Sequence, residues 1–244
     1  MTARNPKTSI QTILGNVMKI LAPRLDPHGV QAGLFAEALY SSAVPEALSD
    51  MDSQALEGIA LSLFDFVRRR TPGQAKVRAY TPNRNDHGWA SSHSVVEIVN
   101  DDMPFLVDSV VAALNRRNLI VHLLIHPIMM IRREGDAVAE IVAVQNARDA
   151  KFRPESVMHI QIDQQPSAAE LSAIEADLAA VLTDVRQTVT DWQKMRDAVD
   201  RAAQALNKVP STFDAEEAVE VKAFLDWLRA DRFTFLGARQ YVLA

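Results

Sequence analysis

The sequence predicts an α+β fold in which helices pack on an antiparallel sheet. Segments whose apolar residues recur every three or four positions, as on one face of a helix, are interleaved with short runs rich in β-branched residues, as in strands. In the middle of the chain the order is strand, helix, strand, strand and one further strand, which places helices against one face of a sheet. The hydrophobic content of 48% over 244 residues is sufficient for such a core.

The first part of the chain predicts a small bundle of three amphipathic helices. Apolar side chains repeat at helical spacing in segments 8–21, 30–40 and 53–70. Thr71, Pro72 and Gly73 then interrupt the pattern. We therefore expect a helical segment at 1–73 and a sheet after it.

Two strands are predicted next, at 76–80 and 93–99, with a polar loop at 83–89 between them. The second strand is rich in valine and isoleucine, which is typical of a central strand buried on both faces. Asp101 or Asp102 is expected to cap the helix that follows, because an aspartate side chain accepts hydrogen bonds from the free N–H groups of a first turn.

The remaining strands and a long helix complete the predicted domain. Segments 119–133 and 137–144 flank a tight-turn sequence and predict a hairpin, and 157–162 predicts another strand, which together give a ferredoxin-like pattern. Apolar residues from Ser167 to Leu206 predict one helix of roughly 60 Å. Its surplus apolar face can pack on the N-terminal helices, on a neighbouring chain or on its own second half.

The end of the chain predicts a helix at 214–228 and a strand at 233–243. Because a lone strand leaves its N–H and C=O groups unpaired, we expect the chain to be part of a longer polypeptide whose next domain starts here. The predicted domains are thus 1–73, helical; 74–209, the α+β domain with its long helix; and 210–244, a helix with the first strand of a following domain.

Composition excludes several classes of function. The chain contains no cysteine, so disulfides, zinc thiolate sites and a cysteine nucleophile are excluded. The net charge of −5 is well mixed along the chain and offers no basic surface for nucleic acid. Polar residues and a proline interrupt the most apolar stretch, 119–131, so we expect no membrane span. Gln11, Asn16 and Lys19 interrupt any signal-peptide core at the start, so we expect a cytoplasmic protein.

The glycine spacing argues against a dinucleotide site in this chain. The eight glycines stand at 15, 29, 33, 58, 73, 88, 135 and 237, so no G-x-G turn exists. We expect no catalytic residues, no bound cofactor and no metal in this part of the polypeptide.

Four separated motifs carry a family resemblance. They are VVEIVNDDMPFLV at 95–107, IVHLLIHP at 120–127, MHIQID at 158–163 and DRFTFLG at 231–237. In this order they resemble the amino-terminal region of large bacterial NAD-specific glutamate dehydrogenases, from about Val77 to the end of the chain. The resemblance implies an ACT-like regulatory region of a parent enzyme that converts L-glutamate, NAD⁺ and water into 2-oxoglutarate, ammonia and NADH.

The resemblance also implies partners. They would be the remainder of the dehydrogenase, its other subunits in a homo-oligomer and an amino-acid effector that regulates amino-acid catabolism allosterically. The alternative is a free-standing ACT-like module that binds an amino acid and acts on a separate protein.

The candidate effector site is the turn between the strand at 93–99 and the next helix. A helix N-terminus favours a carboxylate, and ACT modules bind amino acids at this corner. The residues are Asn100, Asp101, Asp102, Met103, Pro104 and Phe105. Phe105 stands where ACT modules generally have glycine, and the two aspartates would repel a carboxylate, so a purely structural connection is the competing interpretation.

The histidines have structural interpretations. His122 and His126 lie on a predicted strand, roughly 13 Å apart, which is too far for one metal ion. His159 is expected at a sheet surface. A small enzyme that uses Asp101 and Asp102 with His122 or His126 is the remaining hypothesis.

Side chains elsewhere also have structural interpretations. Ser109 beside Asp108 lies inside a helix, which does not fit a hydrolase nucleophile. Trp192 and Trp227 are interpreted as packing anchors, with an interface role as the alternative. The arginines 68–70 are expected to interact with the negative end of a helix dipole.

Overall fold

The computed structural model describes residues 15, 29–44, 47–48, 51, 53–142, 147, 149–208, 214–239 and 241. The chain forms two compact units, Met1–Leu182 and Thr183–Ala244. The predicted helix at 8–21 falls almost entirely outside the described residues. The predicted domain limits at 73 and 209 stay predictions.

The first unit contains a six-stranded antiparallel sheet, which confirms the predicted fold class. Its strands are β1 (Lys76–Tyr80), β2 (Ser94–Asp101), β3 (Val121–Ile125), β4 (Ile128–Glu134), β5 (Ala137–Val142) and β6 (Arg153–Ile162). The spatial order is β1-β2-β6-β4-β5, and β3 also pairs with β6. His126 and Pro127 divide the predicted strand 119–133, so β3 and β4 pair with successive parts of β6.

The edge strand β1 precedes the central strands in the sequence. In the β-α-β-β-α-β order of the ferredoxin-like fold, the last strand follows the second helix. Here β1 comes first and pairs with β2, with Lys76 opposite Val99 and Tyr80 opposite Val95. A side chain of the long helix also reaches this edge, because the Ala79 N–H donates to Glu175 Oε1 at 2.6 Å.

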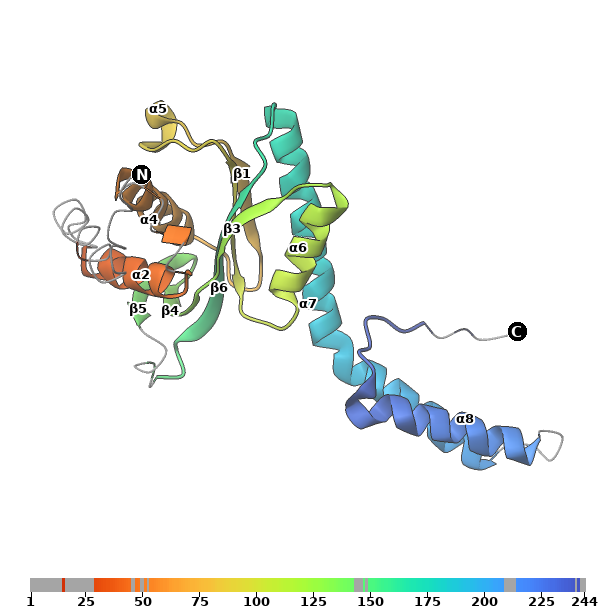
Figure 1. The fold of residues 1–244 in the computed structure, drawn as a ribbon. Helices are drawn as coiled ribbons and strands as arrows, with labels where there is room; N and C mark the ends of the chain where they lie inside the picture. Colours follow the sequence, from red (N-terminus) through yellow and green to blue (C-terminus); the bar gives the residue numbers. More distant parts are fainter. Residues whose placement is uncertain are drawn as a thin grey trace, which may run out of the picture. The chain divides into compact units, whose positions relative to one another are not determined.

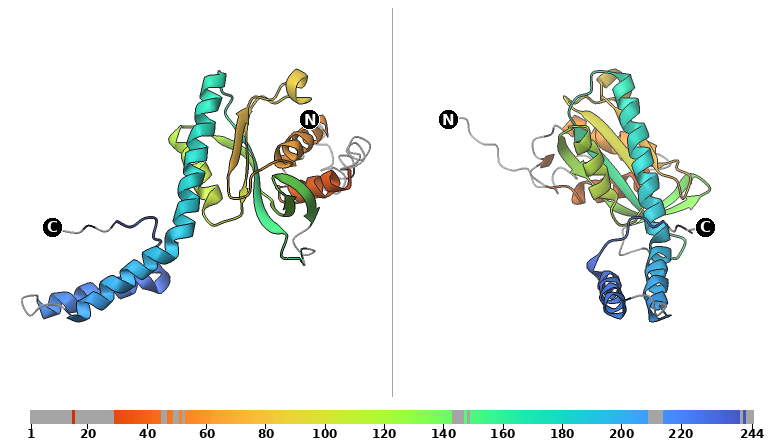
Figure 2. Two further views of the ribbon diagram at one scale, coloured as in Figure 1. Left: turned by 180° about the vertical axis from the view of Figure 1, so that it is seen from behind. Right: turned by 90° about the vertical axis from the view of Figure 1, so that its right-hand side faces the viewer.

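Helices cover both faces of the sheet, whereas the sequence predicted helices on one face only (Figure 1). On one face lie α6 (Leu106–Arg116) and the first part of α7 (Ala168–Ala205), as the view from behind also shows (Figure 2). On the other face lie α2 (Gly29–Ser41) and α4 (Ser53–Val67). A short helix, α5 (Arg84–His87), occupies the segment that the sequence predicted as a polar loop.

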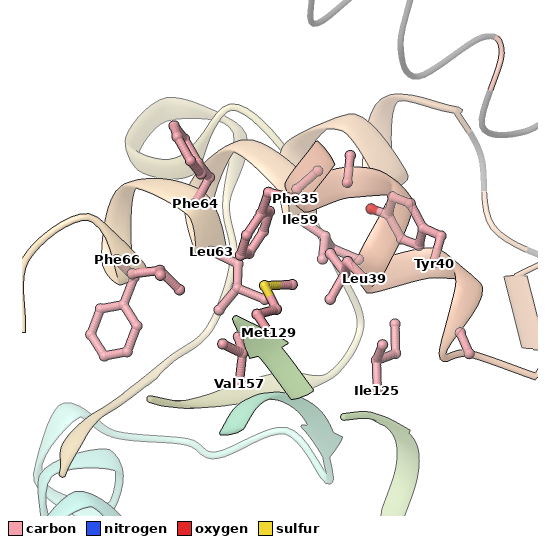
Figure 3. Close-up of a cluster of buried hydrophobic side chains, with 14 of the residues drawn as sticks. Phe35, Leu39, Tyr40, Ile59, Leu63, Phe64, Phe66, Ile125, Met129 and Val157 are labelled. Atoms are coloured by element: carbon pink, nitrogen blue, oxygen red, sulfur yellow. The ribbon is translucent and has the colours of Figure 1, made fainter. Parts of the chain in front are cut away.

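Alternation along the strands divides the apolar side chains between the two faces. Val96 and Ile98 of β2 are directed to the α6 side, whereas Val95 and Val99 belong to the core beneath α2 and α4. Figure 3 shows that core, in which helix residues meet sheet residues. The contributors include Phe35, Leu39, Ile59, Leu63, Ile125, Met129 and Val157.

One glycine allows a close approach in this core. A Cβ atom on Gly58 of α4 would lie 2.4 Å from Cβ and Cγ of Trp89. Trp89 is almost fully buried, and its ring lies 6.1 Å from that of His159 on β6. The missing side chain at position 58 therefore lets α4 pack directly on the indole.

The second unit contains the end of α7, a 3-10 turn Leu206–Lys208, α8 (Ala215–Trp227) and a π-helical turn Leu228–Arg232. The sequence correctly predicted one long helix after Ser167, whose hydroxyl oxygen accepts from the Glu170 N–H at 3.2 Å. Residues 233–239 are not paired as a strand. The proposed strand of a following domain stays a prediction.

Candidate functional site

The corner between β2 and α6 is built differently from the sequence prediction. The residue that caps α6 is Phe105, whose side chain makes no capping hydrogen bond. The expectation that Asp101 or Asp102 caps it is wrong. Asp102 instead donates its backbone N–H to the carbonyl of Pro154 at 3.0 Å, which ties the loop to β6.

Phe105 has a backbone conformation that normally belongs to glycine. Its φ of 71° and ψ of 0° lie in the left-handed region, which costs an L-residue about 1–2 kcal/mol. Its side chain is 44% exposed. The corner thus has a backbone shape suited to glycine, but the residue there carries an aromatic ring.

Asp101 is held on the opposite side of the sheet from α6. Its Oδ1 lies 2.7 Å from Nη2 of Arg70, whose side chain is 2% exposed. Arg70 also contacts Glu155 at 2.9 Å, and Arg133 contacts the same glutamate at 2.6 Å. Burial disfavours the charged form of Arg70, but its bonds to Glu155 and Asp101 outweigh this effect and raise its pKa.

This cluster pairs two buried arginines with two carboxylates. It neutralises Asp101, one of the two aspartates that were expected to repel a bound carboxylate. It also joins the segment just after α4 to β2, β4 and β6. The other residues of the predicted site differ in exposure: Asn100 is fully buried, Asp102 and Met103 are half-buried and Pro104 is exposed.

His126 lies at the same end of the sheet. Its Nε2 is 2.5 Å from Oγ of Ser156, the residue that pairs with Asn100 in the register of β2 and β6. Desolvation lowers the pKa of His126, and the nearby charge of Asp102 opposes this shift. Ser156 is fully buried, so it offers no accessible nucleophile.

His122 belongs to a different group, at the other end of β3. Its ring lies 4.2 Å from that of His93, and its Nε2 is 2.8 Å from Oδ1 of Asp163. The Ile120 N–H and the His122 ring hold the pKa of Asp163 below its usual value. His122 and His126 therefore have separate partners, and within the described ranges no three side chains of metal-ligand type are arranged to hold an ion.

His159 is fully buried, so its predicted place at a sheet surface is wrong. The reason is that α4 and Trp89 cover this face. His159 Nδ1 lies 3.2 Å from Oε1 of Glu97, which also accepts from the Tyr80 hydroxyl at 3.1 Å. Burial and the charge of Glu97 raise the pKa of Tyr80.

Glu97 is also fully buried and ion-paired with Arg78 of β1. The Arg78 guanidinium donates to Oγ of Ser62 in α4 at 2.8 Å. Sequence reasoning missed this network. Its signal was a glutamate within the apolar run VVEIV and an arginine within KVRAY, each at the centre of a predicted strand.

Both networks join the helical layer to the sheet. In each, buried charges meet opposite charges at hydrogen-bonding distance, which is the arrangement expected when the ions stabilise a fixed interface. Their ion pairs and hydrogen bonds hold α4 and the residues just after it against the sheet. The corner at α6 lies beside one of them.

Comparison with known proteins identifies the relatives of this chain. The family model described as "Glutamate dehydrogenase, ACT1 domain" matches residues 35–178. An NAD-specific glutamate dehydrogenase of Halomonas elongata is 35% identical over 231 residues, which cover 94% of this chain and 14% of that protein. One from Pseudomonas aeruginosa is 35% identical over 214 residues, or 88% of this chain and 13% of that protein.

The chain therefore spans about a seventh of the length of the curated relatives it matches. The matched residues include α4, the whole sheet, α6 and the start of α7. The chain belongs to the glutamate dehydrogenase ACT1 domain family.

Proposed function

We propose that this chain is a non-catalytic regulatory and assembly region of an NAD-specific glutamate dehydrogenase. The parent would oxidise L-glutamate to 2-oxoglutarate, with NAD⁺ accepting the hydride at a site elsewhere in the polypeptide. The observation that carries the proposal is the ACT1 match over 35–178, together with relatives whose length is mostly outside this chain. Its partners would be the rest of the dehydrogenase and its other subunits.

The chemistry of the described residues supports a non-catalytic role. The buried side chains of Arg70 and Glu155 are ion-paired with each other, and the buried Glu97 is ion-paired with Arg78. The glycine spacing also lacks the turn that a common dinucleotide site uses. None of the helices described here is long and apolar enough to cross a membrane. We propose a cytoplasmic location with the parent enzyme.

Measurement of NADH formation from glutamate and NAD⁺ tests this function. The full-length polypeptide should be active, and chain 1–244 should form no NADH at the same molar concentration. Glutamate-dependent turnover by the isolated chain would contradict the proposal. A native polypeptide of only 244 residues would favour the free-standing module instead.

A second candidate function is amino-acid sensing at the β2–α6 corner. The observation in its favour is that α6 begins at Phe105, an N-cap residue whose side chain makes no capping hydrogen bond, while Arg70 is ion-paired with Asp101. A ligand carboxylate would accept from these N–H groups at the positive end of the helix dipole. Phe105 would close one side of such a site.

Amide chemical shifts measured while the chain is titrated with each of the amino acids test this candidate. An effector should shift the amides of residues 105–108 in a saturable manner. Replacement of Phe105 by glycine should change the affinity, whereas replacement of exposed Ile120 by serine should not. If no amino acid shifts these amides, the corner is a structural connection only.

A further inference from the structure

The second unit exposes a group of large apolar side chains. We call Trp192, Phe224, Trp227, Phe233, Leu236 and Tyr241 the α8 aromatic surface. Their exposed fractions range from 45% for Trp192 to 78% for Tyr241. The two tryptophans were interpreted as packing anchors, but about half of each side chain is open to solvent.

These side chains are concentrated rather than scattered. Among the described residues, five of the six exposed aromatic side chains lie between 183 and 244, and the sixth is Phe105. Single exposed apolar residues are ordinary, whereas a contiguous group marks a contact surface.

Contacts within the unit connect several parts of this surface. The Phe224 and Trp227 rings of α8 stack with centroids 6.1 Å apart and an interplanar angle of 13°. The Leu236 carbonyl accepts from the Thr188 hydroxyl at 3.3 Å, one helical turn from Trp192 on α7. Arg229, in the π-helical turn after α8, forms an ion pair with Asp200 of α7.

The segment after α8 begins with extended backbone at Phe233. Phe233 has φ −142° and ψ 137°, which are β values, and residues 233–239 form no strand pairing. The rings of Phe233 and Phe235 meet edge to face at 5.3 Å. A strand laid beside this segment would satisfy its backbone groups and cover the aromatic side chains.

We propose that the α8 aromatic surface and residues 233–239 bind a downstream segment of the same polypeptide, which pairs with 233–239 as a strand. This rests on the proposed function, because the relatives are about seven times as long as the matched region. A covalently linked segment has a high effective concentration at this surface and needs little intrinsic affinity. The second unit is therefore the surface on which the following domain packs.

Hydrogen exchange on the native full-length polypeptide and on chain 1–244 tests the inference. Amides 234–239 should exchange at least about a hundredfold more slowly in the full-length protein, because pairing protects them from solvent. The double change Phe224→Ser and Trp227→Ser should abolish most of this protection, and Phe224→Leu should retain it. Ile120→Ser, an equally exposed change in the first unit, is the matched control and should have no effect.

Two outcomes would overturn the inference. Equal exchange in the two proteins would show that no downstream segment covers the surface. Protection in the isolated chain that grows with its concentration would assign the surface to a second copy. The proposed function is tested separately by the length of the native polypeptide. A native polypeptide no longer than this chain would contradict it.

Discussion

Arg70 places its Nη2 atom 2.7 Å from Oδ1 of Asp101, and so joins the residue three positions beyond α4 to the last residue of β2. The pair lies beside the start of α6. Through it, the position of the helical layer is fixed relative to the corner that is proposed to bind a carboxylate. Loosening α4 would free the Asp101 charge and make that corner less favourable for an anion.

Replacement of Arg70 by alanine should lower the free energy of unfolding by about 3 kcal/mol, because it leaves the buried Glu155 with one arginine instead of two. Denaturant unfolding measures this difference. Arg69→Ala is the control: its contact with Asp136 is 3.5 Å long and exposed, so the loss should be below about 1 kcal/mol. Equal losses for both variants would mean that the buried cluster adds nothing.

Replacement of Phe105 by glycine should raise thermal stability. Relief of the left-handed conformation is worth about 1–2 kcal/mol, and the greater freedom of glycine in the unfolded chain offsets about half of that. Thermal unfolding should show the gain. Phe105→Ala removes the same ring but keeps the strain, so a gain of equal size with alanine would disprove this explanation.

His126 should make stability sensitive to acid. Its pKa is lower in the folded chain than the ordinary 6.5, so the unfolded chain binds more protons as the pH falls below that value. The stabilisation by neutral His126 is present above pH 6.5 and is lost as the pH falls through the folded pKa. Unfolding measured from pH 8 downwards should show a shallower acid loss for His126→Gln. Parallel curves for the two proteins would contradict it.

Replacement of Gly58 by alanine should destabilise the first unit by about 1–2 kcal/mol. The new Cβ atom would overlap the Trp89 ring, and this overpacking outweighs the better helix propensity of alanine. Denaturant unfolding followed by tryptophan fluorescence measures the loss. Gly237→Ala meets nothing within 4 Å and should be neutral, so similar results at the two sites would refute the packing argument.

Local patterns in the sequence predicted most of the elements. The strand at 76–80 has the predicted limits, and the helix after Ser167 continues without a break to Ala205. The β6 strand starts earlier than its apolar run, because Arg153, Pro154 and Glu155 pair with β4 although they are not β-branched. The first residue of β6 is thus set by pairing with β4, which is a tertiary contact and not a local preference.

The polar networks could not be predicted in the same way. A glutamate at position 97 or 155 is ordinarily solvent-exposed, and its burial depends on an arginine from a distant segment. The cap of α6 was misassigned because Asp101 has a stronger partner in Arg70. In both cases a long-range contact overrode the local preference of a side chain.

The place of β1 in the sheet has a consequence for synthesis on the ribosome. Residues 76–101 can form an early two-stranded ribbon as the nascent chain emerges, but β6, the other neighbour of β2, is translated some sixty residues later. Until then Glu97 lacks its partner His159, and the sheet that covers the apolar face of α4 is incomplete. During that interval one edge of β2 has no partner strand, and unpaired strand edges favour aggregation.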